Sequence, residues 1–303
     1  MKKNRLGQSD LYVSALGLGC MSLGTDERTA FPILEAAVEA GVNYFDTADL
    51  YDFGKNEQIL GKYFKQNRED VIIASKAGNR WKENKESWTW DASKTYIKEA
   101  AKQSLKRLNT DYIDLYQLHG GTLDDPIDET IEAFEELKAE GYIRYYGISS
   151  IRPNVIREYV NRSNIVSVMM QHSILDRRPE EEALPLLQDK GISVVTRGPV
   201  AKGLLSDNFL NKLTAKGYLD YSEAELRSTL ESLKARFEGK RSLLEAAIQY
   251  NLSSPAVVSV IAGASSAEQL KENATAVNSS ALTLEEQQII QAASKASIYK
   301  EHR

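Results

Sequence analysis

The sequence predicts a (β/α)8 barrel, and three observations support this fold class. Apolar segments with the length of β-strands alternate with segments of helical periodicity from residue 16 to the end of the chain. The strand segments are apolar almost without interruption, as in parallel strands that helices cover on both faces. The chain has 303 residues, the size of one such barrel, so we expect a single domain over residues 1–303.

The expected strands start with a hairpin over residues 2–14, which would cap the bottom of the barrel. The barrel strands follow at residues 16–19, 42–45, 71–75, 112–118, 143–148, 166–170, 192–196 and 256–261. In a barrel of this kind the carboxyl ends of the strands meet at one rim, where active sites lie.

Helical segments separate these strands. The clearest spans residues 97–108, where six residues keep helical spacing: Ile97, Ala100, Ala101, Ser104, Leu105 and Leu108. Further helices are expected before Gly41 (with Ile33, Leu34, Ala37 and Val38 on one face), near 57–64, around Ile131 and Phe134, and from Ser266 onward. Pro153 and Pro179 fall near the starts of two more, where a missing N–H costs nothing.

The connection over residues 203–255 is too long for one βα link. It contains a charged helical stretch over 223–236 and an apolar one over 243–250. We therefore expect extra helices after the seventh strand and at the C-terminus.

Composition excludes several classes of protein. The net charge is −5 and no basic stripe stands out, which argues against binding to nucleic acid. The single cysteine, Cys20, rules out an internal disulfide and fits a reducing compartment. No apolar segment follows the basic first residues, and none reaches the ~18 residues of a membrane span. We expect a cytoplasmic protein without a membrane segment; the oligomeric state stays open.

Ionisable side chains follow three consecutive strands. Asp46, Lys76 and His119 each lie at a strand's carboxyl end, and Tyr51 lies five residues after Asp46. Any one of them alone would usually be structural, but together they predict a proton-donating site. Tyrosine titrates near ~10, and an adjacent ammonium that an aspartate keeps charged would lower this pKa. The three histidines show no metal-ligand spacing, so we expect no metal.

The segments 44–51, 74–76 and 111–119 are similar to motifs of the aldo-keto reductase family, in its bacterial branch that resembles potassium-channel β subunits. The resemblance implies hydride transfer between a nicotinamide cofactor and a small-molecule aldehyde or ketone. It makes Tyr51 the proton donor, Lys76 and Asp46 its tuning pair, and His119 the group that positions the carbonyl.

Two loops are candidates for the cofactor's phosphates, because barrels bind phosphate after strands seven and eight. The loop from Gly198 through Val200, Lys202 and Gly203 to Leu205 offers backbone N–H groups and a cation. The segment from Gly263 leads into a helix that Ser266 and Gln269 could cap as a box; an ordinary turn and cap is the alternative.

The resemblance extends to these loops. Residues 263–273 are similar to the family's segment for adenosine and its 2′-phosphate, with Glu272 and Asn273 at the adenine-contacting positions. Ser265, Ser266 and Gln269 occupy positions that usually carry Arg or Lys, so NADPH is expected and NADH stays open. The remaining implied cofactor contacts are Gly19, Met21, Asp46, Ser149, Gln171 and Arg197.

The nicotinamide end departs from the family's pattern. Ser150 replaces an asparagine, and Met169 aligns with a glutamine that Gln171 could replace, unless Gln171 points at the loop. Arg197 stands where an aromatic ring usually stacks on the nicotinamide; a cation there disfavours the oxidised ring.

Three tryptophans, Trp81, Trp88 and Trp90, fall in the loop after Lys76. They suggest one wall of an apolar substrate pocket, with Met21 and Leu50 on another wall, or they anchor a long loop. Two other functions stay open: a regulatory or sensor protein that binds the cofactor, and an isomerase or aldolase with Lys76 as a Schiff base.

Overall fold

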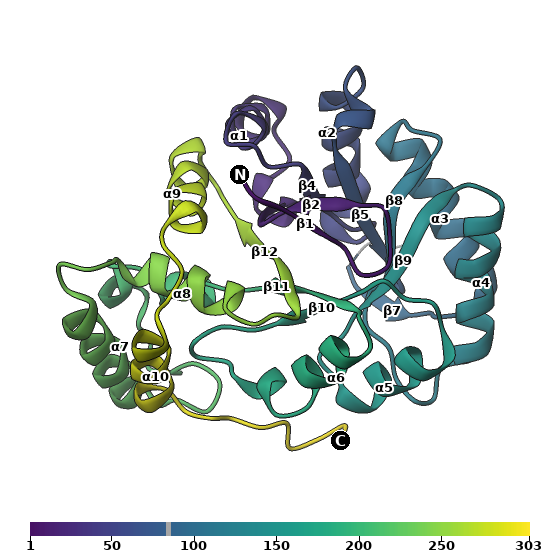
Figure 1. Cartoon of the computed structure of the whole chain (residues 1–303). Coiled ribbons are helices and arrows are strands. Elements are labelled where there is room, and N and C mark those ends of the chain that lie inside the picture. The colour runs from purple at the N-terminus through teal and green to yellow at the C-terminus, as the bar shows by residue number, and fades with distance from the viewer. Residues whose placement is uncertain (83–85) are drawn as a thin grey trace.

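A computed structural model describes residues 1–82 and 86–303, and it contains the predicted barrel (Figure 1). Eight parallel strands close in the order β10-β11-β12-β3-β4-β5-β8-β9. Their bounds are β3 Leu16–Gly19, β4 Tyr44–Asp46, β5 Ile72–Ala77, β8 Ile113–Leu118, β9 Ile143–Ser149, β10 Ser167–Gln171, β11 Ser193–Arg197 and β12 Val257–Gly263. All eight predicted barrel strands are confirmed, with ends shifted by up to two residues.

Helices surround the barrel: α1 Glu27–Glu39, α2 Lys55–Tyr63, α3 Lys94–Leu108, α4 Ile127–Ala139, α5 Pro153–Arg162, α6 Ala183–Asp189 and α9 Ala267–Asn278. The six residues predicted for one face of α3 are all buried. The prediction that Val38 lies on the buried face of α1 is wrong, since this residue is 45% exposed. It lies one residue past Ala37, about 100° around the helix, at the margin of the buried face.

Pro153 begins α5 as predicted, but Pro179 lies in a 3-10 turn, Arg178–Glu180, and α6 starts only at Ala183. Glu182 separates the two because its φ of −138° is not helical.

The predicted hairpin is present as β1 Lys3–Arg5 and β2 Tyr12–Ser14. Leu6, Leu11 and Val13 are buried in one cluster with residues of the barrel interior such as Tyr44 and Leu115, so the hairpin closes the bottom.

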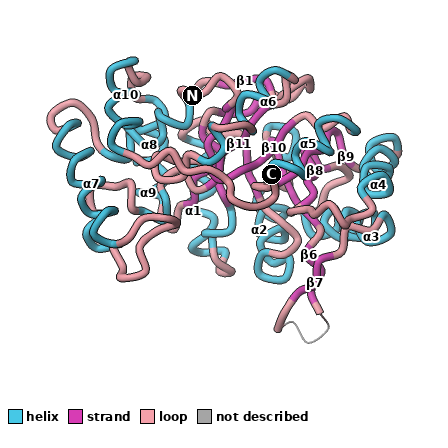
Figure 2. Tube along the Cα trace, turned by 90° about the horizontal axis from the view of Figure 1, so that it is seen from below, coloured by secondary structure: helices cyan, strands magenta, loops and turns pink. Residues whose placement is uncertain are grey.

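The extra helices form a second apolar cluster beside the barrel, made by α7 Glu223–Phe237, α8 Leu243–Leu252 and α10 Leu284–Ala293 (Figures 1 and 2). The chain then runs from α10 toward α5 and α6, where Arg303 contacts Glu181. Among the described residues, no helix is long and apolar enough to cross a membrane.

One hairpin was not predicted. It pairs β6 Asn79–Trp81 with β7 Trp88–Trp90 and projects beyond the ring of helices (Figure 2).

Candidate active site

The barrel brings Asp46, Lys76 and His119 to adjacent positions on one rim. β4 ends at Asp46, β5 carries Lys76 near its end, and His119 directly follows β8. The three strands are neighbours, with Asp46 opposite Ala74 and Lys76 opposite Gln117. Tyr51 begins the turn that follows β4. The four predicted residues therefore share one end of the barrel because parallel strands expose their carboxyl ends together.

Lys76 and Asp46 form a buried ion pair. Lys76 Nζ lies 2.7 Å from Asp46 Oδ1 and 2.7 Å from the backbone oxygen of Thr47, and it donates to both. The two residues are 1% and 4% exposed. Burial alone would lower the Lys76 pKa, but the charge of Asp46 and its hydrogen bond raise it above its ordinary value. The ammonium therefore keeps its charge inside the protein.

Tyr51 stands between this pair and His119. Lys76 Nζ lies 5.2 Å from the centroid of the Tyr51 ring, and the rings of Tyr51 and His119 meet edge to face with centroids 5.9 Å apart. Burial raises the Tyr51 pKa by more than Lys76 lowers it, so the pKa lies above 10.0. The expectation that the Tyr51 pKa is lowered is therefore wrong in its net direction. The phenol holds its proton at neutral pH, as a proton donor must.

His119 is neutral in this environment. Burial, followed by the charges of Lys76 and Arg197, lowers its pKa to about 3. Its Nδ1 is buried and has no hydrogen-bond partner among the described residues. A neutral imidazole carries one N–H, which can donate a hydrogen bond to an oxygen without transferring a proton.

A polar network behind the site was not predicted. Buried Glu57 accepts from Arg107 at 2.6 Å and from Ser75. Asp49, two residues before Tyr51, accepts from Tyr96 at 3.3 Å. Burial and the charge of Glu57 raise the Asp49 pKa to about 7. No pattern in the sequence distinguishes these acids from surface ones.

The loop after β11 differs from the expected phosphate cradle. The N–H groups of Ala201, Gly203, Leu204 and Leu205 already donate to carbonyl oxygens of the same loop. Leu205 is fully buried, so its side chain packs against protein. In this loop the N–H groups of Gly198, Val200 and Lys202 lack partners among the described residues, and Lys202 is an exposed cation without an ion pair there.

The segment after β12 begins α9, and its cap is only half the predicted box. Ser266 Oγ accepts from the Gln269 N–H at 3.2 Å. Gln269 Oε1 turns instead to Ser265, whose N–H and hydroxyl both donate to it. Glu272 is exposed, whereas Asn273 is buried and donates to the oxygen of Gly263 at 3.3 Å.

Gln171 and Arg197 meet at the ends of β10 and β11. Arg197 Nη1 donates to Gln171 Oε1 at 2.9 Å, and Gln171 Nε2 donates to Asp176 at 2.9 Å and Tyr218 at 3.2 Å. Met169 lies in the barrel interior and is 2% exposed. Gln171, rather than Met169, is thus the residue of this strand that reaches the rim. Ser149, at the end of β9, has no side-chain partner among the described residues.

The three tryptophans have different environments. Trp90 donates to Asp125 at 2.7 Å, and its ring fills the space that a Cβ would need at Gly78 and Gly120. Trp81 donates to Leu50 O and packs on Phe53, close to Tyr51. Trp88 is 50% exposed, and Met21 is 67% exposed on the turn after β3. Trp90 anchors the hairpin, whereas Trp81, Leu50 and Met21 lie on the rim side.

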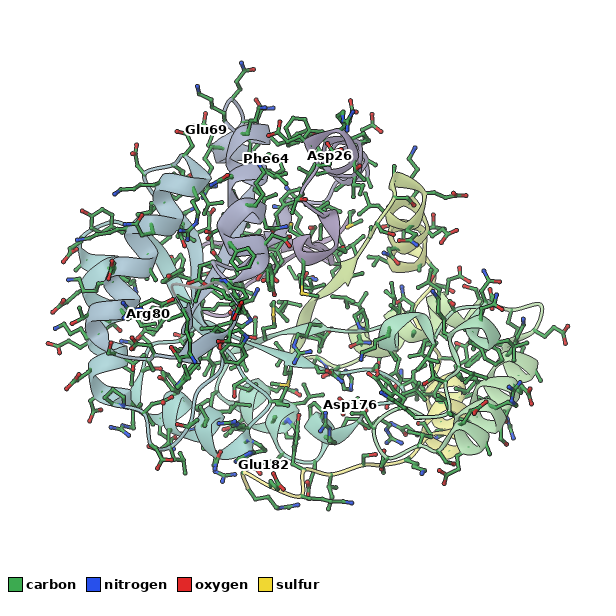
Figure 3. The ribbon with its side chains drawn as sticks, turned by 180° about the vertical axis from the view of Figure 1, so that it is seen from behind. Asp26, Phe64, Glu69, Arg80, Asp176 and Glu182 are labelled. Atoms are coloured by element: carbon green, nitrogen blue, oxygen red, sulfur yellow. The ribbon has the colours of Figure 1, made fainter. Side chains whose placement is uncertain are left out.

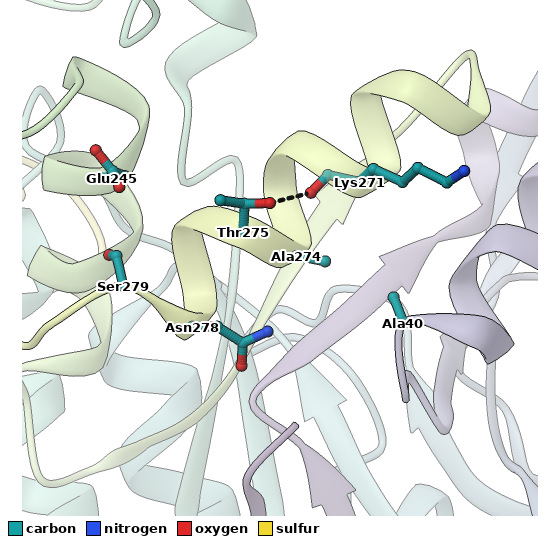
Figure 4. A pocket seen from close by; sticks show the side chains of 7 residues that line it. All are labelled: Ala40, Glu245, Lys271, Ala274, Thr275, Asn278 and Ser279. Atoms are coloured by element: carbon teal, nitrogen blue, oxygen red, sulfur yellow. Dashed lines mark hydrogen bonds between the residues drawn. The ribbon is translucent and has the colours of Figure 1, made fainter.

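Two hollows lie away from the rim. One, of about 490 Å³, is lined by Ala40, Glu245, Lys271, Ala274, Thr275, Asn278 and Ser279 (Figure 4). The other lies beside Met1, Asn43 and Phe64. The first lies near the C-terminal ends of α1 and α9, and the second lies near the β1–β2 hairpin. In a barrel these parts are at the bottom, opposite the rim. His172 is also outside the site, in a buried network with Asn251 and Glu180. Among the described residues, no group of three His, Cys, Asp or Glu could hold a metal.

Comparison with known proteins adds to this geometry. The model of the Aldo/keto reductase family matches residues 15–295. The uncharacterized oxidoreductase YqkF of Bacillus subtilis (strain 168) is 59% identical over 307 aligned positions, which cover 100% of both chains. The NADH-specific methylglyoxal reductase of Escherichia coli (strain K12) is 31% identical, over 92% of this chain and 94% of that protein.

A solved structure is similar over the same length. It is the aldo-keto reductase AKR11C1 from Bacillus halodurans in its holo form, with a TM-score of 0.95 and 61% identity. The superposition covers 100% of this chain and 99% of the other.

Proposed function

Because the chain belongs to the aldo/keto reductase family, we propose that it reduces an aldehyde or ketone to an alcohol, with Tyr51 as the proton donor. The observation that carries the proposal is the buried Lys76–Asp46 pair beside a protonated Tyr51 and a neutral His119. A nicotinamide cofactor, when bound, supplies the hydride.

The four residues divide the work on the carbonyl oxygen. Tyr51 O–H and the His119 N–H donate hydrogen bonds to it and so orient the carbonyl. As negative charge develops on this oxygen, it takes the Tyr51 proton. The Lys76 ammonium then stabilises the phenolate, and Asp46 keeps Lys76 charged and in place.

The same environment opposes a Schiff-base function for Lys76. A lysine nucleophile must lose its proton, which requires a lowered pKa. Lys76 is buried and paired with Asp46, and its pKa is raised above its ordinary value. Borohydride reduction with a carbonyl substrate is expected to leave Lys76 unmodified.

Donors without partners among the described residues lie at the ends of three barrel strands, and their positions fit a dinucleotide. They are the Ser149 hydroxyl at the end of β9, the Gly198, Val200 and Lys202 N–H groups and the Lys202 ammonium after β11, and the N-terminus of α9 after β12. Helix N-termini and lysines favour phosphate. We propose that the nicotinamide lies beside Gln171 and Arg197, near Gly19 and Met21, and that Asn273 and Glu272 lie at the adenine end.

The preference between NADPH and NADH depends on Ser265 and Gln269. Serine can hold a 2′-phosphate without a cation, but here both donor groups of Ser265 are bound to Gln269 Oε1. We propose that the protein prefers NADPH and that its affinity for NADPH exceeds that for NADH by only a narrow margin. A relative is named as NADH-specific. Replacing Ser265 with arginine should widen the margin at least tenfold, measured as the ratio of the Kd values for NADH and NADPH.

The substrate is proposed to be a small carbonyl compound that contacts Trp81, Leu50 and Met21, in a cytoplasmic enzyme. The test is oxidation of NADPH and NADH with a panel of aliphatic, aromatic and dicarbonyl aldehydes. Turnover with at least one aldehyde is expected. Tight cofactor binding without turnover on any carbonyl would overturn the proposal and favour a sensor function.

A further inference from the structure

The turn that begins at Tyr51 has a strained backbone. The next two residues, Asp52 and Phe53, have φ angles of 49° and 55°, and Gly54 follows with a φ of 80°. Left-handed backbone suits glycine, but other residues adopt it at a cost in free energy because their Cβ crowds a carbonyl oxygen. Such backbone persists only where surrounding contacts enforce it. The turn beside the proton donor therefore needs contacts that hold it.

Trp81, at the end of β6, contacts this turn on both sides of Tyr51. Its Nε1 donates to the backbone oxygen of Leu50, the residue before Tyr51, at 3.1 Å. Its ring packs on the ring of Phe53, two residues after Tyr51, with centroids 4.4 Å apart. An indole has one N–H donor and a large rigid ring, so this one side chain restrains both ends of the turn.

The hairpin that carries Trp81 is itself fixed to the barrel. Arg80, the residue before Trp81, lies over the Tyr96 ring of α3, with 5.5 Å between its guanidinium carbon and the ring centroid (Figure 3). On the partner strand β7, Trp90 donates to Asp125 at 2.7 Å. Trp81 is therefore held by a supported hairpin and can transmit that support to the turn.

The same strand also contacts His119. Asn79, the first residue of β6, is 7% exposed, and its Nδ2 donates to the backbone oxygen of His119 at 3.3 Å. Asn79 and Trp81 are two residues apart, so they share one face of the strand. One face of β6 thus contacts the backbone on both sides of the proposed carbonyl position, at His119 and beside Tyr51.

We propose that Trp81 is a positioning residue for Tyr51, which it holds at the substrate's carbonyl oxygen through the Leu50 oxygen and the Phe53 ring. This proposal rests on the proposed function, in which Tyr51 donates the proton. A displacement of about 1 Å can lower the rate of a chemical step by about 10². Trp81 should therefore act on the chemical step, whereas a residue that only lines the pocket acts on KM.

The first test is single-turnover oxidation of NADPH, with an aldehyde that the wild type reduces, in Trp81→Phe and Trp81→Leu. Phenylalanine keeps a ring against Phe53 but cannot donate to Leu50, so the rate at saturating aldehyde should fall about fivefold to tenfold, as for one hydrogen bond. The aldehyde concentration at half-saturation should stay within about twofold in this variant. Leucine loses both contacts, so the rate should fall by about 10². Thr89→Ala, which changes an exposed residue of β7 in the same hairpin, is the matched control.

The second test reads the turn without any reaction, by amide hydrogen exchange and mass spectrometry of peptides from this region. In the turn, the Tyr51 N–H donates to the oxygen of Ala48 and the Lys55 N–H to that of Asp52. These amides should exchange at least about threefold faster in Trp81→Phe, because loss of the contact opens the turn locally. Peptides of β8 should keep the wild-type rate, which shows that the variant is folded. Trp81→Phe decides the matter alone if Trp81→Leu does not fold.

A slower chemical step together with faster exchange in the turn supports the inference. Unchanged exchange in Trp81→Phe overturns it, and so does an unchanged single-turnover rate. A rise in the half-saturating aldehyde concentration alone also overturns it and would assign Trp81 to the pocket wall. Faster exchange in a protein that reduces no carbonyl supports the contact of Trp81 with the turn and contradicts the proposed reaction. Turnover by the wild type with unchanged exchange in the variant does the reverse.

Discussion

Replacing Asp46 with asparagine should leave the Lys76 ammonium buried without its counter-charge, at a cost of about 3–5 kcal/mol of unfolding free energy at neutral pH. Lys76 is 1% exposed, and Asp46 Oδ1 accepts one of its two hydrogen bonds. Asparagine keeps the shape of aspartate and can still accept this hydrogen bond, so the loss of unfolding free energy measures the effect of the missing charge. For a chain of this size, Tm falls by roughly 2 °C per kcal/mol.

The deficit should also shrink as the pH rises. In the wild type, Asp46 raises the Lys76 pKa against burial, so the stability that Lys76 contributes is lost as pH rises from the unfolded-state pKa near ~10.4 through this raised folded-state pKa. Without Asp46, burial prevails, and the folded-state pKa falls below the unfolded value near ~10.4. Between these two values the unfolded variant holds a proton that the folded one lacks, so the variant gains stability with increasing pH.

Urea denaturation at several pH values between 7 and 10 measures both effects. Asp26→Asn is the matched control, because Asp26 pairs with Arg28 at 2.9 Å on the surface and asparagine also caps a helix well. If Asp46→Asn is no less stable than the control, or if its deficit does not change with pH, the buried ion pair does not exist as described.

Three further predictions concern the surroundings of the site. Burial and neighbouring cations lower the His119 pKa to about 3, so the wild type loses stability as pH falls from about 6.5 toward 3. Acid denaturation of His119→Gln, followed by circular dichroism, should therefore be shallower in this pH range. Burial and Glu57 raise the Asp49 pKa to about 7, so the wild type loses stability as pH rises toward 7. The unfolding free energy of Asp49→Asn, measured by urea denaturation and compared with that of the wild type, should therefore be more favourable at pH 8 than at pH 5 by a few kcal/mol. Trp90→Phe should cost about 1–2 kcal/mol, because the hydrogen bond to Asp125 is lost, while the exposed Trp88→Phe should cost less than about 0.5 kcal/mol in the same assay.

The rim residues were predictable because they depend only on where strands end. Asp46, Lys76 and His119 each follow an apolar run, and parallel strands of a barrel must expose those ends together. Tyr51 follows at a short offset, so little chain separates it from the site.

Other features depend on spatial contacts that the sequence does not contain. The pairing of Gln171 with Arg197 requires the register of β10 on β11. The net direction of the Tyr51 pKa follows from burial, which only the packed structure determines. The β6–β7 hairpin has three-residue strands, too short for a recognisable alternation.

The central claim is that Tyr51 donates the proton, and Tyr51→Phe tests it most directly. The variant keeps the ring but lacks the hydroxyl, so the dissociation constant for NADPH should stay within about twofold of the wild-type value while kcat/KM for an aldehyde falls by about 10²–10⁴. Tyr12→Phe, which alters an exposed tyrosine of β2 at the bottom of the barrel, should leave both values unchanged. A Tyr51→Phe enzyme that retains more than about a tenth of the wild-type kcat/KM would contradict the account.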